Sequence, residues 1–244
     1  MRKAGELILF ELPDIALVEV PIEMQGIMQE FLDFDRSLDQ FWLHYERATS
    51  LAGPFVRAAR YSCDHFLLEL RKAKLVKPEL KVACYGSVED ERDRTRLSEK
   101  LLTLELRSKI SRINVKEWRG YLAEELQSSQ SSFKSAHDRL ICRLRGGLKK
   151  AILWCGSASP IVNVLRKDGF QLQIRYATTY LKPPLVTLLA VARIRGLDNI
   201  TDREIETGID MHLKYFNLVI SSENLDAAHK RWEDMVRSTV VSCI

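Results

Sequence analysis

A run of basic residues near the middle of the chain has the types and spacing to bind phosphate. Between positions 139 and 150 there are five basic and no acidic residues: Arg139, Arg143, Arg145, Lys149 and Lys150. Arg139 and Arg143 would share a helical face, and Trp154 follows as a surface for stacking. Such a stripe binds the phosphate backbone of nucleic acid with strong salt dependence and little sequence preference. The alternative is a solvated face, or a patch that docks on an acidic segment of another copy.

The stretch GSASP, directly after this run, combines small residues with the start of a helix. Gly156, Ser157 and Ser159 could present backbone N–H groups to a phosphate, because the helix dipole favours an anion at that end. The same residues can cap a helix without any ligand, since serine followed by proline is common where helices begin. Phosphate binding and simple capping therefore both remain open.

Arg60 and His65 in the stretch RYSCDH have the Arg-x4-His spacing, and this short pattern resembles the motif of the HEPN ribonucleases, a helical family. The resemblance implies that the two side chains would flank a scissile phosphate, often across a dimer. A partly packed surface histidine is the structural alternative. The sequence has no Walker loop, nucleophile elbow or dinucleotide-binding glycine motif. We therefore expect a non-enzymatic protein without a cofactor.

Composition is that of an ordinary globular protein. The chain has 244 residues, of which 46% are hydrophobic and 29% charged. Its five cysteines form no CxxC pair, which argues against a zinc site or a disulfide framework and favours a reducing compartment. No apolar run approaches the roughly 20 residues that a membrane span needs. We therefore expect a cytoplasmic protein with no metal site and no membrane contact.

Charge is unevenly distributed along the chain. The first fifty residues hold four basic and ten acidic side chains, although the whole chain has a net charge of +4. This polarity suits self-assembly, or a basic partner at one end and an anionic partner at the other. Solvated faces on which charges fall unevenly would give the same pattern.

Aromatic and aliphatic residues recur at alternating spacings of three and four in the acidic N-terminal segment. The series predicts one long helix over 24–45 and includes Phe31, Phe34, Leu38, Phe41 and Tyr45. A second stripe follows Pro54, so that the two helices would form an antiparallel hairpin. The aromatic series is then either the core of this hairpin or a seam for a partner helix or second copy.

The remaining signals predict an α+β fold that is predominantly helical. Apolar runs on either side of Pro13 indicate an N-terminal β-hairpin, and QSSQSS at 127–132 indicates a break between helices. AILWC, the helix after Ser159 and the alternating FQLQIRY indicate a small C-terminal strand–helix–strand unit, followed by further helices. The predicted domains are 1–147 and 148–244, unless the two form one continuous domain.

These patterns lead to three functional hypotheses. The first is a nucleic-acid-binding or assembly subunit that contacts the phosphate backbone through its basic helix end. The second is a protein–protein scaffold or homo-oligomer that uses the acidic helical hairpin. The third, implied by the resemblance alone, is a HEPN-like ribonuclease.

Overall fold

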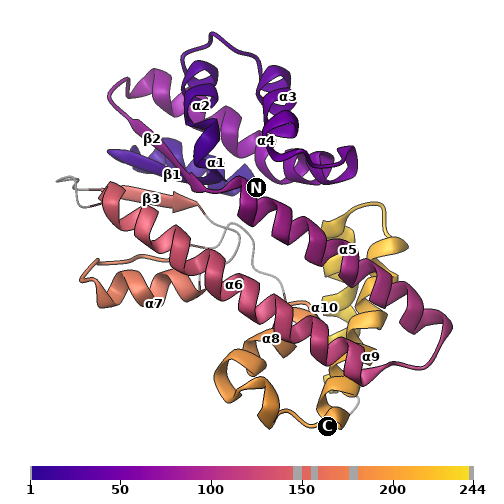
Figure 1. Ribbon diagram of the computed structural model, residues 1–244. Helices are drawn as coiled ribbons and strands as arrows, with labels where there is room; N and C mark the ends of the chain where they lie inside the picture. Colours follow the sequence, from indigo (N-terminus) through magenta and orange to yellow (C-terminus); the bar gives the residue numbers. More distant parts are fainter. Residues whose placement is uncertain (1, 145–149, 155–158, 176–180, 242–244) are drawn as a thin grey trace. The chain divides into compact units, whose positions relative to one another are not determined.

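The computed structural model describes residues 2–144, 150–154, 159–175 and 181–241, and these are predominantly helical with one small sheet (Figure 1). The elements are, in chain order, α1 (Arg2–Glu11), β1 (Ile15–Pro21), η1 (Ile22–Met24), α2 (Gln25–Leu32), α3 (Leu38–Thr49), α4 (Gly53–Val76), β2 (Lys81–Gly86), α5 (Val88–Ile110), α6 (Val115–Leu144), β3 (Ala151–Trp154), α7 (Ser159–Lys167), α8 (Pro184–Arg195), η2 (Leu197–Asn199), α9 (Asp202–Ile220) and α10 (Leu225–Val241).

The chain forms two compact units, each built from two segments of the sequence. Unit 1 comprises residues 1–95 and 130–178, and unit 2 comprises residues 96–129 and 179–244. The two units are not divided after residue 147. The predicted domains, 1–147 and 148–244, concern segments that fold independently, and they stay a prediction. Unit 1 contains the sheet, whereas unit 2 is helical in the part that the structure describes.

The sheet of unit 1 is parallel, so the predicted N-terminal β-hairpin is wrong. Its strand order is β2-β1-β3, with β1 in the middle. Ile15 lies opposite Lys81 on one side and Ala151 on the other, and Val18 lies opposite Cys84 and Trp154. Parallel neighbours cannot be joined by a tight turn, and each partner of β1 therefore comes from a distant part of the chain.

The first apolar run, LILF at 7–10, lies in helix α1 rather than in a strand. A helix satisfies its backbone hydrogen bonds internally, so this run needs no partner strand. Ile8 is fully buried, and the Leu12 N–H still bonds to the Ile8 carbonyl at 2.9 Å. Leu12 has a positive φ of 38° and precedes Pro13, which together end the helix before β1.

Both faces of the sheet are covered, which explains why β1 is buried almost without interruption. On one face, Ala16, Val18 and Cys84 belong to a core with apolar side chains of α1 to α4. On the other face, Leu17 and Tyr85 pack with side chains of α6 and α7. Unit 1 is therefore a three-layer arrangement with the sheet in the middle.

The predicted single helix over 24–45 is interrupted between α2 and α3. Ser37 begins a new helix because it forms a capping box with Gln40, and Phe34 in the preceding turn has a positive φ of 68°. The five residues of the predicted seam divide accordingly. Phe31, Phe41 and Tyr45 lie in the core, whereas Leu38 is partly buried and Phe34 is 51% exposed.

Two further expectations are corrected farther along the chain. The predicted break at 127–132 is wrong, since α6 continues through it and Ser129 bonds back to the Glu125 carbonyl at 2.6 Å. Of the strand–helix–strand unit, β3 and α7 form, but the described residues 170–175 make no strand. Phe170 and Leu172 instead pack beside the core of α6 and α7.

Unit 2 packs parts of α5 and α6 against α8 and α9. Its core includes Trp118, Leu122, Leu188, Ile205 and Ile209. The predicted capping box of Thr201 and Glu204 begins α9, and Asn224 caps α10 through the Ala227 N–H at 2.9 Å. Local helix-start signals were thus confirmed here.

Candidate functional site

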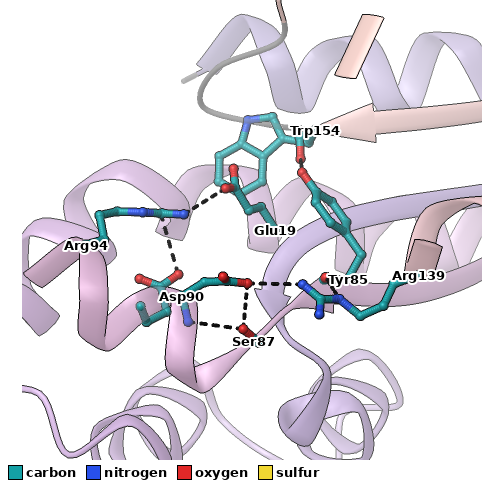
Figure 2. A network of polar contacts seen from close by, with 8 residues as sticks. Glu19, Tyr85, Ser87, Asp90, Arg94, Arg139 and Trp154 are labelled. Carbon is teal, nitrogen blue, oxygen red and sulfur yellow. Dashed lines mark hydrogen bonds and ion pairs between the residues drawn. The ribbon is translucent and has the colours of Figure 1, made fainter. Parts of the chain in front are cut away.

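The carboxyl ends of the three strands form a candidate ligand site. Because β1 has β2 on one side and β3 on the other, the connections diverge there, and open parallel sheets commonly bind ligands at such a point. Side chains from several elements converge at this edge and form two polar networks (Figure 2).

The first network joins the end of β1 to α5. Arg94 donates to the Glu19 carboxylate at 2.9 Å and lies 3.6 Å from Glu91. The Tyr45 hydroxyl is a second neighbour of Glu91 and, like Arg94, favours its ionised form. Burial raises the pKa of the Glu91 carboxyl above its usual value, although Arg94 opposes this rise. A carboxyl group that holds its proton more tightly is a candidate general acid, but here it is already engaged by two neighbours.

The second network joins the end of β2 to α6. Arg139 bonds to the Tyr85 carbonyl at 2.6 Å and to the Asp90 carboxylate at 3.1 Å, and Ser87 donates to the same carboxylate (Figure 2). The Tyr85 hydroxyl reaches across to the Trp154 carbonyl of β3 at 3.0 Å. Arg139, predicted as a phosphate ligand, therefore holds the strand end in place.

The buried thiols of unit 1 are not activated for chemistry. Burial raises the pKa of both Cys63 and Cys84 to about 12, so that each stays protonated at neutral pH. The carboxyl edge thus combines mutually paired charges with unreactive thiols. This arrangement fixes the strand ends and the start of α5.

The other members of the predicted basic run lie in different surroundings. Lys150 bonds to the Glu11 side chain and to the Glu11 carbonyl, the latter at 2.8 Å. The Trp154 ring stacks on Phe66 with 4.2 Å between ring centroids, which places it against the core. Arg145 and Lys149 lie outside the described residues. The run therefore does not form one continuous patch in the part of the chain that the structure describes.

Arg143 faces a groove beside the outer edge of β2. The groove has a volume of about 590 Å³, and its polar lining consists of Gln29, Lys74, Glu79, Lys81, Cys142 and Arg143. Three of these side chains are cationic and one is anionic. Lys74 is fixed in position because its ammonium donates to the Pro78 and Leu80 carbonyls. The result is a groove with a surplus of positive charge.

The sequence predicted Arg143 as a phosphate-binding residue but gave no such prediction for Lys74 or Lys81. These lysines precede Arg143 by 69 and 62 residues in the sequence, and they meet it only because α6 packs across β2. The stretch KPELK at 77–81 held a partial signal, since it places a lysine at the first residue of a strand.

The structure adds little support for the phosphate loop in GSASP or for the ribonuclease pair of Arg60 and His65. Gly156 and Ser157 lie outside the described residues, and α7 begins at Ser159. Arg60 bonds to Asp39 at 2.6 Å and lies 3.8 Å from Asp64. His65 is partly buried, with its Nδ1 atom lacking a partner among the described residues. The phosphate loop and the ribonuclease pair both stay predictions.

Comparison with known proteins does not identify a relative. A scan of protein-family models and searches of curated proteins and solved structures find no match. Among the described residues, no group of three His, Cys, Asp or Glu side chains could hold a metal ion. None of the described helices is long and apolar enough to cross a membrane.

Proposed function

We propose that this protein binds the phosphate backbone of nucleic acid, without catalysing a reaction, in the groove beside β2. The observation that supports the proposal is the convergence of Lys74, Lys81 and Arg143 on one groove that has a single acidic residue, Glu79. Arginine can bind a phosphate through two parallel hydrogen bonds, while lysine acts as a point charge. The binding function expected from the sequence is therefore kept, with a different set of residues.

The edge of β2 disfavours an extended peptide as the occupant. A peptide that joins a sheet needs free N–H and C=O groups along the edge strand. Here the Gln25 side chain already bonds to the Val82 carbonyl at 2.9 Å and to the Cys84 N–H at 2.8 Å. A chain bound by its phosphates has no such requirement.

The proposal predicts weak sequence preference and strong salt dependence. The groove lining includes no aromatic side chain on which a base could stack. If three cations each neutralise one phosphate of a single strand, the logarithm of the binding constant falls with the logarithm of the salt concentration with a slope of about −2. Fluorescence anisotropy with labelled single-stranded and duplex oligonucleotides at several salt concentrations measures this slope.

A charge-matched pair of variants tests the location. Lys81→Ala combined with Arg143→Ala removes two groove cations and should reduce the magnitude of the single-strand slope by about 0.7 for each lost contact. Lys116→Ala combined with Lys230→Ala removes the same charge from exposed positions of unit 2 and should change binding little. Equal losses in both variants, or no loss in the groove variant, would reject the groove as the binding site.

A further inference from the structure

Helix α4 of unit 1 carries an apolar face that no described element covers. Tyr61, Leu68 and Leu75 are 64%, 41% and 62% exposed. They are spaced by seven residues and so lie on one side of the helix. The opposite side is the core face, where Phe66, Leu67 and Leu70 are at most 1% exposed. Three exposed apolar side chains on one side of the helix, opposite its core face, form a candidate interaction surface.

We propose that this face pairs with the same face of a second copy of the chain, with the two α4 helices antiparallel and Leu68 at the centre. A seven-residue repeat on one helix is matched by the same repeat on its copy. In this arrangement Leu68 meets Leu68 of the second copy. Tyr61 of each copy then meets Leu75 of the other.

Charged residues within the stripe select the antiparallel orientation. Asp64 lies four residues before Leu68, and Lys72 lies four residues after it. In an antiparallel pair centred on Leu68, each Lys72 faces Asp64 of the other copy. A parallel pair in register would instead place Asp64 against Asp64 and Lys72 against Lys72, which is unfavourable.

Both charged groups retain capacity for such a contact. Asp64 receives a hydrogen bond from the Trp42 indole through Oδ1, while its Oδ2 lies 3.8 Å from Arg60. Lys72 contacts Glu69 at 2.7 Å, but its side chain is 61% exposed. An ammonium has three donor hydrogens, so a second carboxylate can bind without displacing the first.

The size of the face predicts a reversible dimer. The stripe from Tyr61 to Leu75 is about 21 Å long at the rise of an α-helix. One helix face from each copy is at the small end of specific interfaces, and such interfaces generally dissociate on dilution. We therefore expect the fraction of dimer to rise with protein concentration.

The central leucine gives the decisive experiment. Sedimentation velocity of the full chain over a range of concentrations should show a monomer–dimer equilibrium. Leu68→Lys and Leu68→Glu should each be monomeric, because like charges then meet at the centre, and mixing the two variants should restore the dimer. Leu106→Glu changes a leucine of unit 2 that is 49% exposed and should dimerise like the unchanged protein. Circular dichroism of each variant establishes that it is folded.

Orientation is tested by cross-linking. With Cys142, Cys155 and Cys243 replaced by serine as the background, Tyr61→Cys and Leu75→Cys should form a disulfide-linked dimer when mixed and oxidised, whereas neither variant alone should gain a link over the background. A link within either single variant would show a parallel pair and overturn the proposal. So would a monomeric unchanged protein at every concentration, or Leu68→Lys and Leu68→Glu variants that still dimerise separately.

Discussion

The side chain of Gln25 takes the place of a neighbouring strand for Cys84. Its amide oxygen accepts the Cys84 N–H at 2.8 Å, and its amide nitrogen donates to the Val82 carbonyl at 2.9 Å. These are two of the backbone groups that an added strand would use on the outer edge of β2. A single glutamine at the start of α2 therefore blocks the middle of an edge that would otherwise be open to pairing.

Gln25→Ala should destabilise unit 1 and expose the edge of β2. Two backbone groups would lose their partners, which we expect to lower the free energy of unfolding by about 2 kcal/mol. Urea unfolding measures this change, and light scattering at high concentration measures association through the edge. Gln29→Ala is the matched control, because the Gln29 amide bonds only to Asp33 among the described contacts. Similar losses in both variants would contradict the role of Gln25.

Gly86→Ala should weaken the junction between β2 and β1. A Cβ atom at this position would lie 3.0 Å from both the carbonyl carbon and the carbonyl oxygen of Val20, which are backbone atoms and cannot easily move. We expect a loss of about 1–3 kcal/mol, as for other overpacked sites. Gly26→Ala is the control, because a Cβ there meets nothing within 4 Å. It should leave stability unchanged or raise it by up to about 1 kcal/mol. Calorimetry distinguishes the two, and equal effects would count against the close approach.

Arg139→Met and Arg143→Met should separate stability from binding. Arg139→Met leaves the largely buried Asp90 carboxylate without its cation and should lower the unfolding free energy by about 2 kcal/mol. Its salt slope for nucleic acid should stay unchanged. Arg143→Met changes an exposed side chain. It should leave the unfolding free energy nearly unchanged and should flatten the salt slope for nucleic acid. If Arg139→Met flattened the salt slope of a folded protein, the continuous patch expected from the sequence would be right.

Acidification should destabilise unit 2 through His229. Burial lowers the pKa of His229 below its usual value, although Asp226 and Glu233 oppose this shift. The unfolded chain then binds the proton more readily, so the stability from neutral His229 is present above about pH 6.5 and is lost as the pH falls below it. Urea unfolding at several pH values should show a shallower acid-side decline for His229→Gln, which cannot titrate. An unchanged decline would exclude His229 as the cause.

Acidification should stabilise unit 1 through His137, in contrast to the effect of His229 on unit 2. Its ring lies 2.7 Å from Asp168, and this hydrogen bond raises the pKa of His137 above its usual value. The stabilisation is therefore fully present below about pH 6.5 and is lost as the pH rises through the raised value. Asp168→Asn should thus be more destabilising at pH 6 than at pH 9. A penalty of equal size at both values would mean that the contact does not depend on charge.

Helix starts could be predicted from the sequence because their signals are local. The pairs Ser87 with Asp90, Asn114 with Glu117 and Thr201 with Glu204 all form the expected capping contacts. A cap depends on residues three positions apart, and distant parts of the chain hardly affect it. The strands β2 and β3 were also anticipated, since each is a short apolar run between turns.

Pairing between distant segments could not be predicted in the same way. LILF at 7–10 has the composition of a strand, but β1 obtains its partners from residues 81–86 and 151–154, and the run remains helical. The surroundings of the basic run were not predictable for a related reason. Arg139 and Arg143 are one helical turn apart, yet the first reaches Asp90 at one end of β2 and the second faces the groove. Which charges neutralise one another depends on tertiary packing.

The order of the strands also bears on how the protein is made. β1 lies in the middle of the sheet but leaves the ribosome before either of its partners, and its second partner ends only at Trp154. At usual rates of translation, the edge of β1 that pairs with β3 waits for its partner for a time on the order of ten seconds. The nascent chain is therefore most exposed to misassociation at its most deeply buried strand, and chaperone demand should fall once residue 154 has emerged.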